Sequence, residues 1–497
     1  MPLYESINLH PSNFSVSELK ERVYDVVCIG SGWSGRIIAG RVRKAGLSVV
    51  IIEDELLGGE CPFWACVPSK ALLRPQDALD EAKVVQGLKE RINTAEGLDA
   101  NQVFKRRDTY AHRFDDGDVV VPMVLGFGAA IVRGTGSLIG EKKVAVKSVT
   151  GERIELEARH AVIVGTGSEP VIPKIPGLAE AKPWLSRNAT CSSVAPEHLI
   201  ILGGGVVGCE MATAYVSLGS KVSLVCKRPL VLSRLDPEVG ELVGKSFVSH
   251  GIDVYLSTGV EKVTRESDGT VKVEISGGKV LSGTEILVAA GRRARTADAG
   301  LETFNIKTDG SPIAVDEGLE VKSVPGGWLY AVGDVNGRAP LTHSCKYHGR
   351  LVANAIMAKA QGVKIESKDW GSTSATADRL ALPQVVFSNP EVASVGLTRT
   401  AAKTAGKSVR AVTAPVVTLG AMLRTEGYER GWAQWVIEEG SGKLLGATFV
   451  GQNVADLLHA STVAVVGGMT VEQMSHAIPS FPTMSEVYLN LIEAAGY

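Results

Sequence analysis

The chain has 497 residues, of which 45% are hydrophobic and 21% are charged, and its formal net charge is -2. This length predicts three or four globular units of about 150 residues each. The nearly neutral charge gives no long-range attraction to nucleic acid or to an anionic membrane. The sequence contains no run of about 18 apolar residues that could span a membrane, and its N-terminal residues lack the apolar stretch of a secretory signal. We therefore expect a cytoplasmic protein that binds neither nucleic acid nor a membrane.

The first predicted unit is a strand, a glycine turn and a helix, followed by a second strand. Its parts are residues 24–29, the turn glycines Gly30, Gly32 and Gly35, residues 48–52, and Glu53. Glycines at this spacing let the backbone approach a pyrophosphate at the start of the helix, and a carboxylate at the end of the second strand suits a ribose hydroxyl. The glycine pattern in this context predicts a dinucleotide site.

Two cysteines, Cys61 and Cys66, follow in a run that also contains Pro62 and Pro68. Residues five apart on an ideal helix differ by about 7.5 Å in rise and about 140° in rotation, outside the Cα separation of roughly 4.4–6.8 Å that a disulfide tolerates. Because proline fixes φ and lacks an N–H, we expect the prolines to break the backbone into a loop that closes a redox pair. The alternative is two unrelated thiols.

The remaining cysteines show no clustered His and Cys spacing, so the sequence predicts no metal site. We interpret all five as core residues: Cys28, Cys191, Cys209, Cys226 and Cys345.

The strand, turn and helix pattern recurs in the second part of the chain. Its parts are a strand over 198–202, the turn glycines Gly203, Gly205 and Gly208, a helix over 209–218, and a strand over 221–226. Cys226 occupies the position where an NAD site carries a carboxylate, and Lys227, Arg228 and Arg234 are close by in the sequence. Cations there suit a 2′-phosphate, which favours NADPH over NADH, although a solvated basic patch remains the alternative.

Two short segments, 165–168 with Gly167 and 289–292 with Gly291, predict passages between the nucleotide-binding domains. Residues 328–332 form another buried strand pattern, and Asp334 after it places a carboxylate where it can bond the ribityl or phosphate region of a flavin. From residue 369 the pattern changes to an α+β domain. Its predicted elements are strands over 384–388 and 431–438 and helices from Asn453 and Val471.

Together these residues resemble the pyridine nucleotide-disulfide oxidoreductases, the family of glutathione reductase, dihydrolipoamide dehydrogenase and mercuric reductase. The resemblance covers the chain from Tyr24. It is carried by the Gly30 turn, residues 61–70, 165–167, the Gly203 turn with Glu210, and residues 291–292, 333–334 and 387–396.

The resemblance implies an α/β fold with two Rossmann-like domains and an α+β interface domain, FAD and NADPH as cofactors, and a homodimer. The predicted boundaries are 1–168 for the FAD domain with the cysteine pair, 169–290 for the NAD(P)H domain, 291–368 for the central domain and 369–497 for the interface domain.

By position in the family, Cys66 is the thiolate that contacts the flavin and Cys61 is the thiol that attacks the substrate. Hydride from NADPH would reach the flavin, which would reduce the disulfide. Lys70 and Glu210 match the pair beside the flavin N5, where a cation favours the reduced flavin. The alternative for Lys70 is a surface lysine.

The C-terminal segment departs from the family pattern, since Phe481 occupies the place of the acid-base histidine while Glu486 is retained. A phenyl ring cannot exchange protons, and such a loss typically costs 10² to 10⁴-fold in rate. His476 is a substitute only if the loop folds back, and otherwise a surface or packing residue. At this one position the chain resembles the 2-ketopropyl-coenzyme M oxidoreductase/carboxylase branch, which leaves thioether cleavage open.

A second departure is the aromatic pair Phe63 and Trp64 between the cysteines, which predicts an apolar thiol site. The two rings are either core aromatics or substrate contacts, and their position between redox cysteines is expected to limit how deeply they are buried.

Three hypotheses follow. The first is an FAD enzyme that passes electrons from NADPH through Cys66 and Cys61 to a sulfur-containing substrate, such as a disulfide, a thiol adduct or a thioether. The second is a quinone or diaphorase-type flavin reductase in which the cysteines are not essential. The third is a non-enzymatic redox sensor or interaction module.

Overall fold

A computed structural model of the chain describes residues 3–92, 97–366, 368–424 and 431–497. Its largest sheet has seven strands in the order β3-β2-β1-β6-β5-β4, with β16 paired to β6. The strands are β1 (Val23–Ile29), β2 (Val49–Glu53), β3 (Ala130–Arg133), β4 (Thr135–Gly140), β5 (Lys143–Lys147), β6 (Arg153–Val164) and β16 (Leu329–Ala331). Strands β1, β2, β3, β6 and β16 pair in parallel, and all of β2 is buried, as expected for parallel strands covered on both faces.

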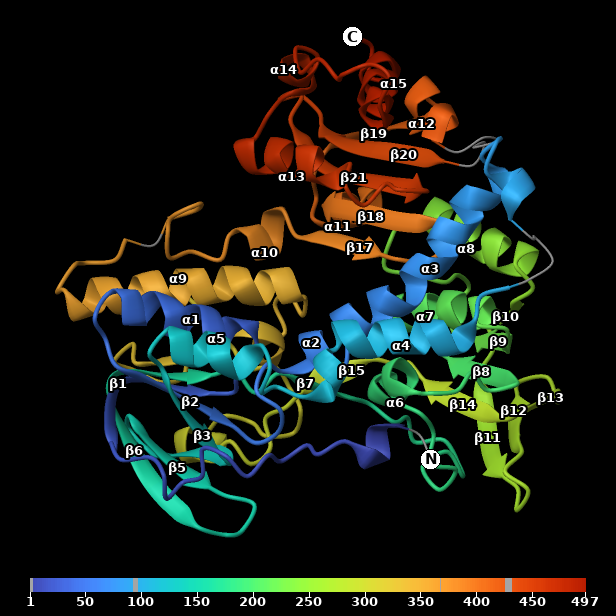
Figure 1. Cartoon of the computed structure of the whole chain (residues 1–497). Coiled ribbons are helices and arrows are strands. Elements are labelled where there is room, and N and C mark those ends of the chain that lie inside the picture. Colours follow the sequence, from blue (N-terminus) through green and yellow to red (C-terminus); the bar gives the residue numbers. More distant parts are fainter. Residues whose placement is uncertain (1–2, 93–96, 367, 425–430) are drawn as a thin grey trace.

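Two helices that lie far apart in the sequence pack side by side above this sheet (Figure 1). They are α1 (Trp33–Lys44), which starts directly after the first glycine turn, and α9 (Thr342–Ala360). The shorter α5 (Val120–Gly126) also contacts α1. The sequence after residue 300 therefore completes the domain that the first 60 residues begin.

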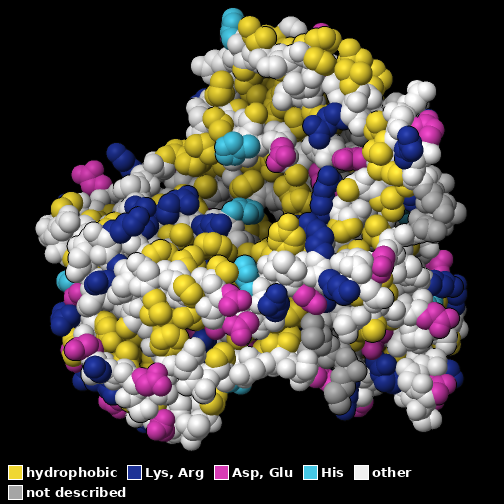
Figure 2. Space-filling model, viewed as in Figure 1, with side chains coloured by type: hydrophobic (Ala, Val, Ile, Leu, Met, Phe, Trp, Pro, Cys, Tyr) yellow, Lys and Arg dark blue, Asp and Glu magenta, His cyan; other side chains and the backbone are white. Residues whose placement is uncertain are grey.

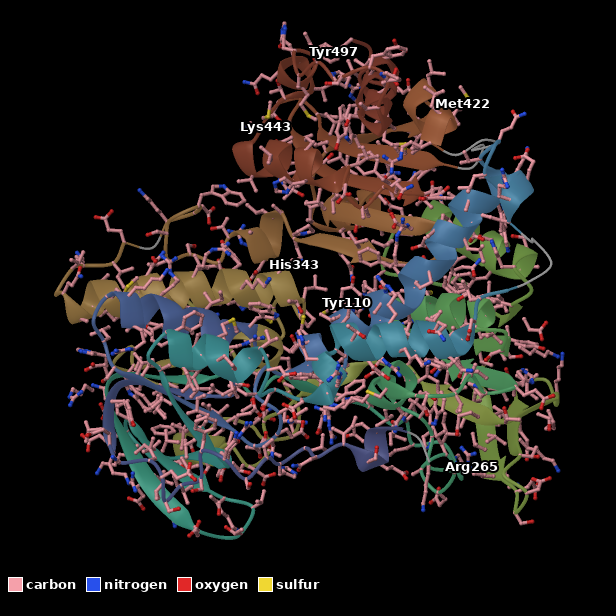
Figure 3. The ribbon with its side chains drawn as sticks, viewed as in Figure 1. Tyr110, Arg265, His343, Met422, Lys443 and Tyr497 are labelled. Carbon is pink, nitrogen blue, oxygen red and sulfur yellow. The ribbon has the colours of Figure 1, made fainter. Side chains whose placement is uncertain are left out.

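The second sheet is parallel, in the order β10-β9-β8-β14, and lies beside the three-stranded antiparallel sheet β11-β12-β13. The strands are β8 (His198–Leu202), β9 (Lys221–Val225), β10 (Asp253–Tyr255), β11 (Val260–Arg265), β12 (Val271–Ile275), β13 (Val280–Gly283) and β14 (Glu285–Val288), and the helices of this region are α6 (Ser186–Cys191), α7 (Val206–Ser217) and α8 (Pro237–Ser249). In Figure 3, Arg265 marks the end of β11.

The chain passes between the two nucleotide-binding regions at two points, and these points are paired with each other. β7 (Ser168–Pro170) and β15 (Arg292–Ala294) form a two-stranded antiparallel ladder. Arg292 strengthens it by donating from Nη2 to the Ser168 carbonyl oxygen at 2.7 Å and from Nε to the Ser168 hydroxyl at 2.8 Å.

The C-terminal domain is a five-stranded antiparallel sheet in the order β17-β18-β21-β20-β19, flanked by helices. Its elements are β17 (Pro383–Val386), β18 (Glu391–Gly396), β19 (Val409–Pro415), β20 (Trp432–Glu438), β21 (Leu444–Gly451), α11 (Arg399–Thr404), α12 (Leu419–Arg424), α13 (Leu458–Gly467), α14 (Val471–Met474) and α15 (Val487–Ala494), and α10 (Ala377–Leu380) precedes it. Figure 3 shows His343, near the start of α9, below this sheet, and its Nε2 donates to the Pro383 carbonyl oxygen at 2.8 Å.

The predicted α/β architecture with an α+β C-terminal part is confirmed. Two predicted helices differ, because α13 starts at Leu458 rather than Asn453, and the helix from Val471 ends after one turn at Met474. No helix within the described ranges is long and apolar enough to cross a membrane.

Candidate active site

The first glycine turn lies beside a buried carboxylate. Glu53 Oε2 accepts hydrogen bonds from the backbone N–H of Ser31 at 3.0 Å and from its hydroxyl, while Oε1 accepts the backbone N–H of Asp54 at 3.0 Å. Burial raises the pKa of Glu53, and the Asp54 carboxylate raises it further. Glu53 is thus fixed at the end of β2, next to the turn.

In this turn the backbone is in close contact with other backbone atoms at Gly30 and Gly35, whereas there is free space beside Gly32. A Cβ on Gly30 would lie 2.3 Å from the Gly165 carbonyl oxygen, and one on Gly35 would lie 2.5 Å from the Gly30 oxygen. A Cβ on Gly32 would have no other atom within 4 Å. An open backbone surface at the start of α1 fits the pyrophosphate of a dinucleotide.

Two further predicted residues lie at the edge of the same site. Asp334, in the 3-10 turn that follows β16, accepts the Ser168 hydroxyl hydrogen on Oδ2 at 2.6 Å. Gly167 has a φ of +78°, and a Cβ on it would also have no other atom within 4 Å. The open turn, the buried Glu53 and Asp334 make a donor and acceptor set that fits FAD.

The second turn repeats the geometry of the first. A Cβ on Gly203 would lie 2.3 Å from the Ala289 oxygen, and one on Gly208 would lie 1.9 Å from the Gly203 oxygen, whereas Gly205 and Gly291 have no atom within 4 Å of the same position. The same closed and open pattern at the start of α7 fits a second dinucleotide.

The basic residues after β9 lie at the surface beside this second turn. Cys226 is buried, and its Sγ would lie 2.8 Å from a Cβ on Gly204, so it packs beneath the turn. Lys227, Arg228 and Arg234 are exposed, and none of them forms an ion pair with a residue that the structure describes. These three cations are therefore available to an anionic group on the nucleotide.

The cysteine pair lies where two helices meet and where α9 begins. Cys61 is in α2 (Glu60–Phe63) and Cys66 is the first residue of α3 (Cys66–Val84). Both are free thiols that shift each other's pKa, and Cys66 Sγ lies 3.1 Å from Thr342 Oγ1. Residues 276 apart in sequence thus meet at the sulfur atoms.

The backbone break between the cysteines is not where the prolines predicted it. Ala65, with φ −130° and ψ −97°, interrupts the helical path, whereas Pro62 lies inside α2 and Pro68 lies in the first turn of α3. The prediction was wrong in this detail because the N–H that proline lacks has no intrahelical acceptor in the first turn.

The pKa values of the two thiols are shifted in opposite directions. The hydrogen bond from Cys66 lowers the pKa of Cys61 against the effect of burial, and Thr342, Trp33 and the charge of Arg36 lower it further. The same contact with Cys61, together with burial, raises the pKa of Cys66. The pair therefore loses its first proton from Cys61, and a thiolate is the reactive form in attack on sulfur.

Lys70, about one helical turn after Cys66, forms an ion pair with Glu210 of α7. Lys70 Nζ lies 2.7 Å from Oε2 and 2.9 Å from Oε1 of Glu210. The Glu210 side chain is only 5% exposed, and its Oε1 also accepts the backbone N–H of Phe387 at 3.1 Å. Lys70 is a cation held in place by a buried carboxylate rather than a free surface lysine.

The aromatic residues between the cysteines belong to the core. Phe63 is 0% and Trp64 1% exposed, and the Trp64 ring stacks on Phe114 at 5.6 Å and meets Tyr4 edge-on at 5.6 Å. The expectation that the position of these rings limits their burial was wrong, because both rings belong to the hydrophobic core that also contains the strands of the first sheet. They cannot form an apolar wall for a substrate.

Of the five cysteines interpreted as core residues, four are buried and Cys345 is only partly so. Its Sγ lies 3.9 Å from Asp334 Oδ1, at the edge of the first dinucleotide site. The core interpretation was wrong for Cys345 because it lies in the first turn of α9, at the surface of the site.

Three residues around the thiols were missed in the sequence: Trp33, Arg36 and Thr342. Trp33 and Arg36 lie in the first turn of α1, Trp33 between Gly32 and Gly35 and Arg36 directly after Gly35. The available signal for Arg36 was a charged residue on the helix face that packs inward. Thr342 carried no signal, since only the fold brings α9 to the cysteines.

The C-terminal segment carries the residues that depart from the family pattern. Phe481 is 69% exposed, and Glu486 accepts the backbone N–H of Gly420 on Oε2 at 3.2 Å. His476 is exposed on the surface, in agreement with the surface interpretation. In the described part of its own chain, Phe481 is therefore an uncovered apolar side chain.

Phe481 is one of several exposed apolar side chains of the C-terminal domain. Figure 2 shows hydrophobic side chains gathered over this part of the molecule. The exposed members are Val417, Leu419, Met422, Leu423, Val463, Val466, Ile478, Phe481, Leu489 and Tyr497. Apolar side chains that gather on the surface of one domain are typical of protein interfaces.

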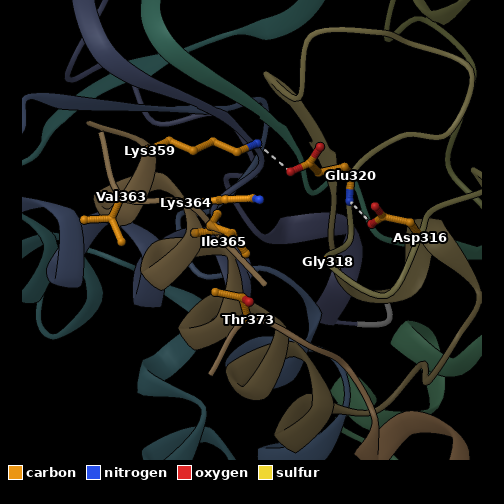
Figure 4. A pocket seen from close by; sticks show the side chains of 9 residues that line it. Asp316, Gly318, Glu320, Lys359, Val363, Lys364, Ile365 and Thr373 are labelled. Atoms are coloured by element: carbon orange, nitrogen blue, oxygen red, sulfur yellow. Dashed lines mark hydrogen bonds and ion pairs between the residues drawn. The ribbon is translucent and has the colours of Figure 1, made fainter. Parts of the chain in front are cut away.

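A separate cavity of about 430 Å³ lies at the far end of α9 (Figure 4). Its charged lining residues include Asp316, Glu320, Lys359 and Lys364, and Lys359 points to Glu320, with which it forms an ion pair. No cysteine is among its lining residues, so it is distinct from the thiol site.

Comparison with known proteins agrees with the geometry. A family model described as pyridine nucleotide-disulphide oxidoreductase matches residues 24–362, and the model of the dimerisation domain of that family matches residues 382–492. The structure of the flavoprotein disulfide reductase RclA from Escherichia coli, in its Cu(II) complex, superposes with a TM-score of 0.79 over 95% of this chain and 99% of that chain. At 23% identity this similarity concerns the fold.

Two sequence relatives match over almost their full length. A mercuric reductase from Streptomyces lividans is 32% identical over 466 residues, which cover 93% of this chain and 94% of the relative. A dihydrolipoyl dehydrogenase from Geobacillus stearothermophilus is 30% identical over 479 residues, which cover 95% and 96%. The chain therefore belongs to the pyridine nucleotide-disulphide oxidoreductase family, as a flavin-dependent oxidoreductase acting on sulfur groups that carries the family's dimerisation domain.

Proposed function

We propose that the protein uses NADPH and FAD to reduce the Cys61–Cys66 pair, which then transfers electrons to a sulfur-containing substrate. The observation that supports this most strongly is the arrangement of the two thiols. They act on each other's pKa and lie beside Thr342, in the segment that packs against the first glycine turn. FAD, when bound, supplies the two-electron transfer between the nicotinamide and the disulfide.

The chain's own residues carry the thiol chemistry. With a disulfide substrate, the Cys61 thiolate attacks one sulfur, a Cys61–substrate disulfide forms and the first substrate thiolate leaves. The Cys66 thiol then loses its proton to solvent and its thiolate attacks Cys61 Sγ, which restores the Cys61–Cys66 disulfide and releases the second substrate thiolate. Two electrons pass from the cysteine pair to the substrate, and each leaving thiolate takes a proton from solvent because Phe481 cannot donate one.

Three features of this proposal come from the resemblance and the sequence. They are a homodimer in which Phe481 and Glu486 reach the site of the other subunit, roles for Lys70 and Glu210 beside the flavin, and domain boundaries at residues 168, 290 and 368. The exposure of Phe481, whose side chain is 69% accessible in its own subunit, supports the first of these.

Anaerobic titration of the purified FAD-loaded protein with NADPH tests the proposal. If the pair is competent, two electrons per subunit should appear as two titratable thiols while the flavin absorption is retained. Bleaching of the flavin by the first two electrons, with no thiols formed, would contradict it.

The coenzyme preference follows from the cations beside the second turn. We expect the wild type to have the higher kcat/KM with NADPH, and the double variant Lys227→Ala/Arg228→Ala to raise the KM for NADPH by about 10-fold or more, since charge-assisted hydrogen bonds contribute about 1.5–3 kcal/mol each. The KM for NADH should change little. Steady-state kinetics with both coenzymes gives the measurement.

Lys221→Ala is the matched control for this experiment, because Lys221 is an exposed lysine at the other end of β9. It should leave both KM values unchanged. A wild-type enzyme with the better kcat/KM for NADH would refute the assignment of NADPH.

A further inference from the structure

A buried arginine, Arg36, lies under the segment that carries Cys61. Its side chain is 3% exposed, and it donates from Nη2 to the Gly58 carbonyl oxygen at 2.9 Å and from Nε to the Ser31 carbonyl oxygen at 3.1 Å. Within the described ranges it forms no ion pair, and Glu53 acts on it only through space. Buried cations normally have a carboxylate partner, so this charge requires an explanation.

The charge of Arg36 and that of a Cys61 thiolate act on each other, because Arg36 is hydrogen-bonded to Gly58, three residues before Cys61. Cys61 is the first group whose charge favours the protonated form of Arg36, ahead of Glu53, and Arg36 in turn lowers the pKa of Cys61. Burial lowers the pKa of Arg36 to about 10, which still leaves the guanidinium charged at neutral pH. The interaction is therefore between a permanent cation and a sulfur that ionises.

A second cation reaches the same place through Trp33. The Arg36 guanidinium lies 4.1 Å from the centre of the Trp33 ring, and the Lys346 ammonium of α9 lies 3.9 Å from it. Figure 2 shows Lys and Arg side chains gathered over α1 and α9. The indole of Trp33, which itself lowers the pKa of Cys61, is thus held between two cations.

The charged and titratable groups around Cys61 come from every element packed against it. Helix α3 contributes Cys66 and Lys70, which acts on Cys66, and α2 contributes Glu60. Helix α1 contributes Arg36, on which Glu53 of β2 acts, and α9 contributes Cys345 and Lys346. Glu60 is neutralised by Arg187, whose Nη2 lies 2.5 Å from Glu60 Oε1. Arg36 therefore acts on Cys61 as a cation that has no ion-pair partner among the described residues.

We propose that Arg36 is a positioning residue that supplies a fixed positive charge to keep Cys61 as a thiolate, in a site whose acid-base imidazole is replaced by Phe481. An imidazolium both stabilises a thiolate and donates a proton, because its ordinary pKa is about 6.5. A guanidinium stabilises the thiolate without donating a proton. With Arg36 in place of a histidine, the site keeps the stabilisation of the thiolate and loses the donation of a proton.

This inference depends on Cys61 being the attacking thiol of the proposed function, but its test needs neither an acceptor nor turnover. The FAD-loaded full-length protein is reduced anaerobically, excess reductant is removed, and the rate of Cys61 alkylation by iodoacetamide is followed by mass spectrometry from pH 5 to pH 9. The midpoint of the rate profile reports the ionisation of Cys61.

We expect the wild-type midpoint to lie below the value of roughly 8.5 of an ordinary cysteine. Arg36→Met should raise it by about one unit or more, as expected when an opposite charge a few ångströms away is lost. Arg36→Lys should stay near the wild type, and Arg36→Gln, which keeps a donor for the Gly58 carbonyl oxygen, should behave like Arg36→Met. The matched control Arg41→Met removes an exposed arginine of the same helix and should have no effect.

The FAD content and the midpoint of each variant together distinguish a charge that stabilises the Cys61 thiolate from a cofactor ligand and from a purely hydrogen-bonding role of Arg36. A loss of FAD by Arg36→Met and Arg36→Gln with an unchanged midpoint would overturn the proposal and make Arg36 a cofactor ligand. Equal shifts in Arg36→Lys and Arg36→Met would also overturn it, because the hydrogen bonds rather than the charge would then be responsible. If no neutral variant folds, a wild-type midpoint at the ordinary value is sufficient to refute it.

Discussion

Cys61→Ser should reduce 5,5′-dithiobis(2-nitrobenzoate) with NADPH at least about 1000-fold more slowly than the wild type, because a serine hydroxyl forms neither a thiolate nor a disulfide. The loss should appear in kcat, while the KM for NADPH and the FAD content stay the same. Cys61 belongs to the segment beside the first glycine turn and is not part of the second glycine turn, where NADPH is proposed to bind. Release of the coloured thiol, normalised to bound FAD, gives the measurement.

Cys191→Ala is the control for this variant. Burial raises the pKa of Cys191 to about 12, so its thiol stays protonated and should not take part in the reaction. Menadione reduction by Cys61→Ser should be retained, because a quinone can accept electrons from the flavin directly. Full turnover of the disulfide by Cys61→Ser would instead favour a flavin reductase in which the cysteines are secondary.

Phe481→His should accelerate disulfide reduction by about 100-fold, the lower range of what a positioned general acid contributes. Glu486 follows five residues later and is already fixed by the Gly420 N–H, so a carboxylate is available to orient a new imidazole. The pH profile of kcat should gain a limb near the ordinary histidine pKa of about 6.5. Stopped-flow traces of thiol release across pH 5 to 9 provide both readouts.

Phe481→Leu separates the proton donor from a simple loss of the ring, since it removes the phenyl group and adds no titratable atom. It should not be faster than the wild type. Equal acceleration by leucine and histidine would mean that Phe481 restricts access to the thiols rather than withholding a proton.

The two nucleotide sites were predictable because their determinants are local. Each one depends on a strand, a glycine turn and a helix within about 30 residues, and the close approach of the backbone at Gly30 and Gly208 is a property that only glycine satisfies. The pairing of Lys70 with Glu210 came from matching two distant positions to a family, and no spacing rule would have produced it.

The residues that were misjudged depend on long-range packing. Whether Trp64 faces a substrate or the core depends on Phe114 and Tyr4, which lie 50 and 60 residues away from it. The environment of Cys61 depends on Thr342 and Lys346 of α9, which no local pattern connects to the cysteines. Such contacts are set by the sheet order, and a periodicity of side chains carries no information about them.

The pairing of α1 with α9, and of β16 with β6, means that the N-terminal domain is built from two pieces of chain separated by the second nucleotide-binding region. During translation this inserted region leaves the ribosome before the residues that finish the sheet of the N-terminal domain. Until α9 emerges, the inner face of α1 and the edge of β6 are exposed. Protection of that nascent surface, by a chaperone or by rapid folding of the insert, is thus a requirement for the yield of functional protein.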